Sequence, residues 1–421
     1  MTRHFAFALL CASVTAAVAA QSVPTAGTVP RPRARDLGLS SLIGGTTGPL
    51  DAITDVPGVE VGHTTVIAGE GPLVVGKGPV RTGVTVVHPR GRSTVDPVFG
   101  AWFTLNGNGE MTGTTWLEES GFLEGPVAIT NTHSVGAVHD AILRWQVSRP
   151  GQQPWGLPVV AETYDGGLND INGFHVTAEH VVAALDGARS GLVPEGNVGG
   201  GTGMVCHQFK GGIGTASRIV TVGGSTFTVG VLVQCNYGER ARLAVAGVPV
   251  GQEIPDLLPC QSLGDLDGDW PNRRCNSAAS GPRAHRDERI VEAGDADVGS
   301  IIVVAATDAP VLPHQLNRLA RRVSLGIGRL GGVGGNSSGD IFVAFSTANP
   351  GAAAREGRPS LLMLPNAQIT PLFTATVQAT EEAILNALLA AETMVGANGI
   401  RVEALPPDRL LAAMRKYGRL P

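Results

Sequence analysis

The residues Gly334-Gly335-Asn336-Ser337-Ser338-Gly339-Asp340 form a polar, glycine-rich stretch, and the apolar run Ile341-Phe342-Val343-Ala344-Phe345-Ser346-Thr347 follows it directly. The first stretch favours a turn, whereas the second is typical of a buried strand. Cleavage of the Asn336-Ser337 bond would therefore leave Ser337 near the start of a strand with a free α-amine. A hydroxyl nucleophile needs a nearby base, and an α-amine with a pKa of about 7.7–8.0 can be that base. An ordinary turn or linker is the alternative interpretation.

The composition is that of a globular protein with many turns. The chain has 421 residues, of which 43% are hydrophobic, 5% are aromatic and 58 are glycines. This length allows one large core or two smaller ones. The formal net charge is −5, with 31 Lys and Arg residues against 36 Asp and Glu residues. Because this balance provides no basic surface for nucleic acid, we expect a small neutral or zwitterionic ligand.

The first 20 residues have the features of a secretory signal peptide. Arg3 gives a basic start, an apolar and alanine-rich run follows from Phe5 to Ala20, and small residues precede Gln21. A retained anchor is the alternative, but the run is short for a membrane-spanning helix. The sequence therefore predicts a periplasmic or secreted protein without membrane attachment after signal removal. Residues 21–50 are expected to form an extended N-terminal arm.

Four cysteines lie beyond the signal segment. Cys260 and Cys275 bracket a short loop rich in Asp, Gly, Pro and Asn, and export would allow a disulfide between them. Cys206 and Cys235 lie in strand-like sequence and are expected to be buried as small apolar residues, with a second bridge as the alternative. The spacing of Cys and His residues does not fit a zinc site.

The pattern of apolar residues predicts a mixture of strands and helices. Strands are expected at 59–66, 83–87, 127–132, 159–164, 219–222, 227–234, 300–307 and 341–347. Helices are expected at 113–121, 135–146, 177–188, 312–324 and 371–396. Because no strict βαβ period is visible, the sequence predicts a layered α+β fold. Folded sequence is expected from residue 51 onward, with a polar insertion at about 252–297, and the length alone favours about two to three domain equivalents.

Three other motifs have simpler interpretations than catalysis. The glycines at 199–203 lack the Lys and Ser/Thr ending of a phosphate-binding loop, so close backbone approach is expected there. His133 stands beside Ser134, but without a nucleophile elbow to partner it we expect a helix cap at Ser134 and a structural histidine. The turn-rich loop at 106–110 is not followed by the pattern of a phosphate cradle.

Several short motifs together point to one family. They are Thr130-Asn131-Thr132-His133-Ser134-Val135-Gly136, Ala161-Glu162-Thr163-Tyr164-Asp165-Gly166, Gly201-Thr202-Gly203-Met204, Gln234-Cys235-Asn236-Tyr237-Gly238, Ala306-Thr307-Asp308-Ala309-Pro310, Gly335-Asn336-Ser337-Ser338-Gly339-Asp340 and Ala379-Thr380-Glu381-Glu382-Ala383. These motifs occur in the order seen in one family, and through them the chain resembles the self-processing serine aminopeptidases. This family includes the L-aminopeptidase/D-amidase-esterase and the β-peptidyl aminopeptidases. The resemblance covers roughly residues 36–418, interrupted mainly by the polar insertion.

The resemblance implies an αββα-layered sandwich, an architecture shared with the ornithine acetyltransferases. Members of the family cut themselves immediately before the nucleophilic serine, which here corresponds to the Asn336-Ser337 bond. Residues 51–421 would then form a single catalytic domain, with a large chain over residues 51–336 and a small chain over residues 337–421. Both would remain in one protomer, and a homo-oligomer, commonly a tetramer of such protomers, is implied.

The resemblance also implies roles for single residues. Ser337 is the expected nucleophile and its own α-amine the expected base. Family members place a hydroxyl and a carboxylate near that amine, and Thr380 with Glu382 fits the spacing. Glu381, with Ala379 at the hydroxyl position, is the alternative register. Either carboxylate is also a candidate to bind the substrate amine.

Asn236 and Tyr164 match positions that the family uses around the scissile carbonyl, with Asn236 as a donor to the oxyanion. The implied reaction is hydrolysis of an N-terminal amide bond through an acyl-enzyme, without metal or organic cofactor. The implied substrates are peptides, amides or esters with small L-, D- or β-amino acids. An acyltransferase related to ornithine acetyltransferase and an exported non-enzymatic binding protein are the alternatives. The polar insertion is expected to be a surface or entrance loop held by the Cys260-Cys275 bridge.

Overall fold

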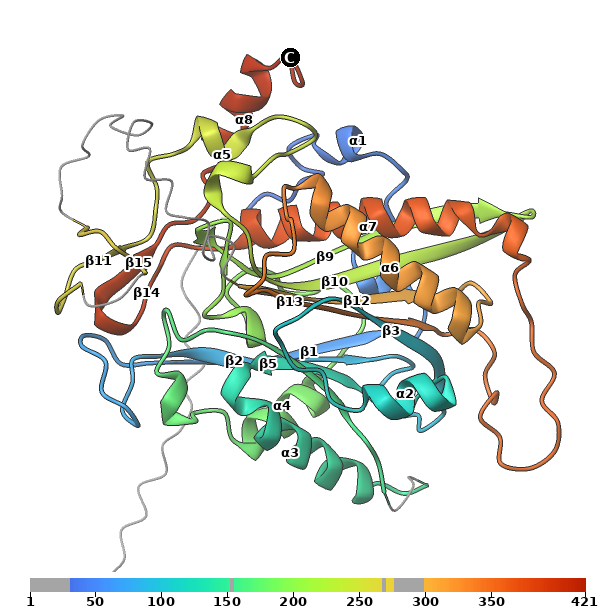
Figure 1. The fold of residues 1–421 in the computed structure, drawn as a ribbon. Helices are drawn as coiled ribbons and strands as arrows, with labels where there is room; N and C mark the ends of the chain where they lie inside the picture. The colour runs from blue at the N-terminus through green and yellow to red at the C-terminus, as the bar shows by residue number, and fades with distance from the viewer. Residues whose placement is uncertain (1–30, 152–154, 267–269, 276–298) are drawn as a thin grey trace, which may run out of the picture. The chain divides into compact units, whose positions relative to one another are not determined.

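The computed structural model describes residues 31–151, 155–266, 270–275 and 299–421 (Figure 1). Residues 32–421 form one compact unit, and the chain up to Arg31 is assigned to a separate unit. The expected signal peptide, residues 21–30 of the expected arm and much of the polar insertion lie outside the described residues. Within the described ranges, every helix is too short or too polar to cross a bilayer.

The first of the two larger sheets has four strands. In spatial order they are β1 (Glu60–Ala68), β2 (Val80–His88), β5 (Val127–Asn131) and β6 (Val159–Thr163). Neighbours are antiparallel except β5 and β6, which are parallel. Every residue of β2, β5 and β6 is buried, which indicates that this sheet is covered on both faces.

The second sheet has six strands. In spatial order they are β4 (Phe122–Leu123), β3 (Val98–Gly107), β13 (Gly339–Ser346), β12 (Ser300–Thr307), β10 (Ser225–Asn236) and β9 (Gly212–Val222). Strand β13 runs parallel to β12 and antiparallel to β3. The apolar run after Ser337 therefore becomes an inner strand, because its residues are buried on both faces.

Four layers follow from the way these elements pack. Figure 1 shows α6 (Pro313–Arg329) and α7 (Thr370–Ala390) on one side of the paired sheets, and α3 (Val135–Val147) and α4 (Ala178–Gly187) on the other. One apolar cluster, including Ile129 and Phe345, fills the space between the sheets, and separate clusters lie under each pair of helices. The arrangement is the αββα sandwich that the resemblance implies.

Shorter elements complete the described fold. The helices are α1 (Ser40–Ile43), α2 (Thr114–Ser120), α5 (Val250–Glu253) and α8 (Pro407–Lys416). The strands are β7 (Val205–Cys206), β8 (Phe209–Lys210), β11 (Cys260–Gln261), β14 (Met394–Val395) and β15 (Ile400–Val402). The helix expected at 371–396 is too long, because the chain turns after Ala390 and pairs β14 with β15. Strand β3 was not expected from the pattern of its residues.

The expected extended arm is wrong for residues 32–50, which pack against the body of the protein. Ala34, Leu39 and Ile43 are buried in the cluster under α6 and α7. The guanidinium of Arg33 lies 2.7 Å from the Glu195 carboxylate. The N–H of Ala34 donates to Asn386 Oδ1 on α7 at 2.9 Å. Apolar side chains and a buried ion pair thus order a segment whose composition near its start favours an extended conformation.

The structure contains two disulfides within the described residues. Cys260 is bonded to Cys275, the pair predicted from the loop between them, and β11, which contains Cys260, pairs with β15. Cys206 is bonded to Cys235, so the expectation of two unbonded apolar cysteines is wrong. The fold places β7 beside the end of β10, and the resulting Cα–Cα separation of 5.6 Å suits a disulfide.

The glycine motif and the histidine motif are structural. Gly199–Gly201 forms a single 3-10 turn, and a Cβ on Gly200 would lie 2.7 Å from the carbonyl oxygen of Ile129. This confirms the expected close backbone approach. The N–H of Ser134 donates to Asn131 Oδ1 at 2.9 Å, so Asn131 rather than Ser134 provides the side-chain cap. His133 stacks against Phe174.

Candidate active site

Ser337 lies in the segment that connects α6 to β13, at one edge of the paired sheets. The first N–H of β13, that of Gly339, donates to Ser300 Oγ at the start of β12 (3.1 Å). Asn108, just after the end of β3, donates from Nδ2 to the main-chain carbonyl of Ser337 (2.7 Å). The strands β3, β6 and β10 end on this side of the sheets, and β12 and β13 begin there. We call this set of strand ends the Ser337 edge. The main chain of the serine is thus held there while its side chain is partly exposed.

Asn236 is the last residue of β10 and is held in one orientation at this edge. It lies opposite Ser300, which in turn lies opposite Gly339. Its Oδ1 accepts from the N–H of Val205 at 2.7 Å, and its Nδ2 donates to the carbonyl of Tyr164 at 3.0 Å. An amide nitrogen carries two N–H donors, and Tyr164 takes one of them. Among the described residues the second is available to an oxyanion.

Tyr164 follows β6 and is 52% exposed. Its ring lies over Gly166, where an added Cβ would come within 2.9 Å of the ring carbon Cε1. Partial burial and the neighbouring Asp165 carboxylate raise the pKa of the Tyr164 hydroxyl. Tyr164 therefore contributes in two ways at the Ser337 edge. Its carbonyl orients Asn236, and its ring is about half exposed to solvent.

Glu162 is a functional candidate to which the sequence analysis assigned no role. It is the second-last residue of β6, is 3% exposed, and accepts a hydrogen bond from the N–H of Glu110 at 3.0 Å. Its other carboxylate oxygen accepts from the Thr132 hydroxyl. A Cβ on Gly109 would lie 3.2 Å from Glu162 Oε1 and 3.1 Å from Gly339 Cα, so the carboxylate is close to the start of β13.

Burial raises the pKa of the Glu162 carboxyl, and hydrogen bonds from Thr132 and the Glu110 N–H oppose this shift. A buried carboxylate near the end of a strand, beside the segment that carries the expected nucleophile, can bind a substrate ammonium group. One acidic residue within an otherwise apolar, fully buried strand was the available signal in the sequence.

The structure does not bring Thr380 and Glu382 together as a pair. Thr380 is fully buried, donates its hydroxyl to the carbonyl of Thr376 (2.8 Å) and faces Gly326 of α6. Glu382 is fully buried as well, but its carboxylate binds Arg218 of β9 at 2.5 Å and the Ser40 hydroxyl. Residues two apart on a helix point to different sides, which explains the separation. Their joint role beside the Ser337 amine stays a prediction that these contacts do not support.

Glu381 lies between them and forms an ion pair with Arg329. Burial raises the pKa of the Glu381 carboxyl, and the Arg329 cation opposes this shift. Arg329 is the last residue of α6, the helix from which the chain runs on to Ser337. Of the three α7 residues predicted at the site, Glu381 is therefore the one whose partner borders the nucleophile segment. Its role also stays a prediction.

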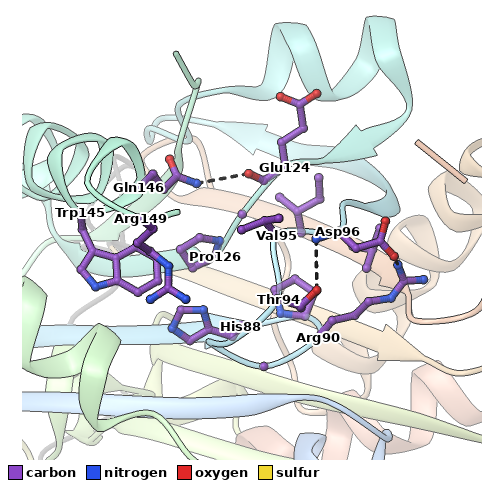
Figure 2. A pocket seen from close by; sticks show the side chains of 15 residues that line it. His88, Arg90, Thr94, Val95, Asp96, Glu124, Pro126, Trp145, Gln146 and Arg149 are labelled. Atoms are coloured by element: carbon purple, nitrogen blue, oxygen red, sulfur yellow. Dashed lines mark hydrogen bonds and ion pairs between the residues drawn. The ribbon is translucent and has the colours of Figure 1, made fainter. Parts of the chain in front are cut away.

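A hollow at the other end of the first sheet is separate from the Ser337 edge. Figure 2 shows Trp145 and Gln146 of α3 and Arg149 just beyond the helix around it, facing His88 at the end of β2. The guanidinium of Arg149 stacks on the Trp145 ring at 4.2 Å, and Gln146 Nε2 donates to the Glu124 carbonyl at 3.2 Å. Burial lowers the pKa of His88 to about 4. These polar groups support each other and form no catalytic arrangement. Within the described ranges no cluster of three side chains suits a metal ion.

An αββα sandwich whose inner strand begins just after a held serine, with an oriented amide donor at the same end of the sheet, is the arrangement of a hydrolase of the N-terminal-nucleophile type. The sequence comparison agrees with this class, because residues 51–402 match the model of peptidase family S58. The chain belongs to this family of serine aminopeptidases.

Similar proteins cover nearly the whole chain. The β-peptidyl aminopeptidase BapA of Sphingosinicella microcystinivorans is 52% identical over 96% of this chain and 97% of its own. The L-aminopeptidase D-Ala-esterase/amidase of Ochrobactrum anthropi, a variant of the N-terminal-nucleophile hydrolase fold, is 46% identical with a TM-score of 0.79. A β-aminopeptidase of a Burkholderia species is 46% identical with a TM-score of 0.77. Each of these two structures matches over 93% of this chain and 100% of its own.

Proposed function

We propose that this protein is an exported aminopeptidase that cuts its own Asn336-Ser337 bond and then removes small N-terminal residues through an acyl-enzyme on Ser337. The observation that carries the proposal is the placement of Ser337 at the edge that also holds Asn236 and Glu162. The test is steady-state hydrolysis of aminoacyl p-nitroanilides by the purified protein, with intact-mass measurement of its chains. Hydrolysis by a cut protein is expected. A cut protein without hydrolysis of any L-, D- or β-aminoacyl amide would contradict the proposed activity.

Each group at the Ser337 edge has a task in this reaction. The α-amine of Ser337 takes the proton from its own hydroxyl, which attacks the carbonyl carbon of the substrate. The second N–H of Asn236 donates to the oxygen on which negative charge develops. The carboxylate of Glu162 binds the ammonium group of the substrate, which restricts attack to the first residue of a peptide. The C–N bond of the substrate then breaks, and the leaving amine takes the proton that the α-amine of Ser337 holds. Water hydrolyses the ester and restores Ser337.

Replacement of Glu162 by glutamine is expected to lower kcat/KM by about a hundredfold, mainly through KM, because a buried partner of the substrate ammonium loses its charge. The pH profile provides a second readout. Wild type needs both the Ser337 amine and Glu162 unprotonated, so log kcat/KM should approach a slope of 2 at low pH. In wild type, protonation of the Glu162 carboxyl, whose pKa is raised by burial, removes substrate binding at low pH. The glutamine variant lacks this titrating group, so its slope should be 1.

Glu195→Gln is the matched control for this prediction. Glu195 is also a buried carboxylate, but its partners are Arg33 and the N–H of Thr215, away from the Ser337 edge. We expect its replacement to lower thermal stability while kcat/KM and the slope of the pH profile stay close to wild type. Equal effects of the two substitutions on KM would argue against a substrate contact at Glu162.

The relatives support small N-terminal residues as substrates. One relative is described as a β-peptidyl aminopeptidase and another as an L-aminopeptidase with D-Ala-esterase and amidase activity. We propose that this chain accepts L-, D- or β-residues of small size from peptides, amides or esters. The β-backbone differs from the α-backbone by one methylene, which changes binding by only about 1–3 kcal/mol. The preference among them therefore depends on the shape of the pocket.

Part of the polar insertion approaches the Ser337 edge. A Cβ on Gly167 would lie 3.2 Å from Trp270 Cη2, so the Trp270 ring rests near the turn that follows Tyr164. We expect Trp270→Ala to lower kcat/KM by about fivefold for peptides of four or more residues and by less than twofold for aminoacyl amides. The reason is that only a long leaving group reaches an entrance loop. Trp155→Ala, which alters another exposed tryptophan, is the control. Equal losses for both substrate types would contradict this role.

The proposal of export rests on the sequence of the first 20 residues, and the two disulfides support an oxidising compartment, periplasmic or extracellular. Assembly into a homo-oligomer of two-chain protomers is proposed from the family resemblance. The family match favours hydrolysis over acyl transfer as the reaction of this site.

A further inference from the structure

We propose that Asn106 and Asn108 hold the main chain on both sides of the Asn336-Ser337 bond for self-cleavage, and that Asn106 acts only before the bond is cut. This inference rests on the proposed self-processing. It assigns a positioning task to the loop at 106–110, for which the sequence analysis predicted no function. The two asparagines contact different sides of the bond, and this difference carries the argument.

The bond lies at the centre of a β-turn. The N–H of Ser338 donates to the carbonyl of Gly335 at 2.9 Å, which closes a four-residue turn with Asn336 and Ser337 as its middle residues. Neither middle residue has a positive φ, as a type I turn requires. The central peptide takes no part in the closing hydrogen bond, and Asn336 is exposed. The turn therefore presents the Asn336 carbonyl without using it.

Two side-chain amides fix the flanking carbonyls. Asn106 Nδ2 donates to the carbonyl of Gly335, the residue before the central pair. Asn108 Nδ2 donates to the carbonyl of Ser337, on the other side of the bond, at 2.7 Å. Asn106 belongs to β3, where it lies opposite Asp340 of β13, so the first amide comes from a paired strand. The two donors restrict rotation of the peptide between them.

The cleavage step needs this restriction. Ser337 Oγ attacks the carbonyl carbon of Asn336, a C–O bond forms, the C–N bond breaks, and the hydroxyl proton passes to the leaving nitrogen. The product is an ester with a free α-amine on Ser337. Water then hydrolyses the ester to an Asn336 carboxylate and the Ser337 hydroxyl. Because attack requires the oxygen and the carbon to be aligned, holding both neighbouring carbonyls lowers the entropy cost of reaching that geometry.

The cut separates the tasks of the two asparagines. Gly335 then belongs to the free end of the large chain, so the contact from Asn106 no longer bears on the nucleophile. Ser337 keeps its carbonyl and hence its contact with Asn108. Loss of Asn106 should therefore slow cleavage only, whereas loss of Asn108 should slow cleavage and also lower kcat of the mature enzyme.

The experiment compares Asn106→Ala, Asn108→Ala and Asn317→Ala in the full chain. Asn317 is the matched control, because its Nδ2 also donates to a carbonyl of β3, that of Trp102, at 2.7 Å. The uncut fraction is followed by intact mass after synthesis, and kcat and KM are measured once each protein is fully cut. We expect Asn106→Ala to slow cleavage about tenfold with kcat and KM within about twofold of wild type. Asn108→Ala should lower both rates about tenfold, and Asn317→Ala neither.

Cleavage of Asn106→Ala at the wild-type rate would overturn the inference, and so would a loss of kcat as large as the loss of cleavage rate. If Asn106→Ala does not fold, Asn106→Asp decides the matter, since it keeps the size of the side chain and removes the donor. An uncut wild-type chain is a different result, because it would overturn the proposed self-processing itself.

Discussion

Replacement of Ser337 by alanine is expected to give one uncut chain that hydrolyses aminoacyl amides at least about 10⁴-fold more slowly than wild type, because the hydroxyl serves both reactions. Wild type should give two chains, the smaller starting at Ser337. Intact mass shows whether each protein is cut, N-terminal sequencing shows whether the smaller chain starts at Ser337, and the rate of amide hydrolysis measures the loss of activity. The loss should appear in kcat, since the substrate-binding groups at the Ser337 edge are unchanged.

Ser338→Ala is the matched control for this prediction. The Ser338 hydroxyl is next in the chain but fully buried, and it donates to Asp340 Oδ1 at 2.6 Å. Its replacement should lower stability but leave cleavage at the same bond. Two chains from Ser337→Ala would show that another group or a contaminating protease cuts the protein. An uncut Ser337→Ala chain with full activity would contradict the role of this serine in hydrolysis.

Replacement of Asn236 by alanine is expected to lower kcat by about 10²–10³-fold, the usual loss when one donor to an oxyanion is removed. The KM for small amides should change little, since the donor acts mainly on the charge that develops during attack. Self-cleavage should slow by a similar factor if the same donor acts on the Asn336 carbonyl. Rates of cleavage and of amide hydrolysis, measured on one preparation, compare the two effects.

Asn236 also holds Val205 and Tyr164, so a loss of activity needs a structural control. Asn197 likewise pairs with main chain through its side-chain amide, donating to the Glu392 carbonyl at 2.8 Å and accepting from the Glu392 N–H at 3.2 Å. Asn197→Ala should therefore change thermal stability without lowering kcat. A rise in KM at constant kcat for Asn236→Ala would mean that this residue binds the substrate in its ground state and does not stabilise the oxyanion.

The sequence predicted the inner strands well, because burial on both faces leaves a clear apolar run. Strand β12 has the expected bounds, and β13 begins two residues earlier than expected. Strand β3 was missed because its first half is buried and its second half is not, which interrupts the pattern. Asn106 and Asn108 were therefore assigned to a loop, whereas one belongs to β3 and the other lies just beyond it.

Contacts between distant segments could not be predicted from local pattern. Cys206 and Cys235 are 29 residues apart and meet because β7 lies beside β10. The proposed role of Glu162 depends on the end of β6 lying near Gly339, which only the stacking of the two sheets provides. In contrast, the family resemblance predicted site roles for Ser337 and Asn236 from short motifs, and both residues lie at the Ser337 edge. It placed Thr380 and Glu382 by spacing alone, and the helix separates them.

Strand β13 lies between β3 and β12, and the proposed cut would leave it in a different polypeptide from both neighbours. The smaller fragment would thus be threaded through the centre of the larger one, with α7 packed across β9 and β10. Two separate fragments would have to associate before they could fold together, whereas the uncut precursor would fold without an association step. The proposed cut would therefore follow folding: the protein would fold as a single molecule first, and after the cut its native state would persist mainly through a slow rate of unfolding.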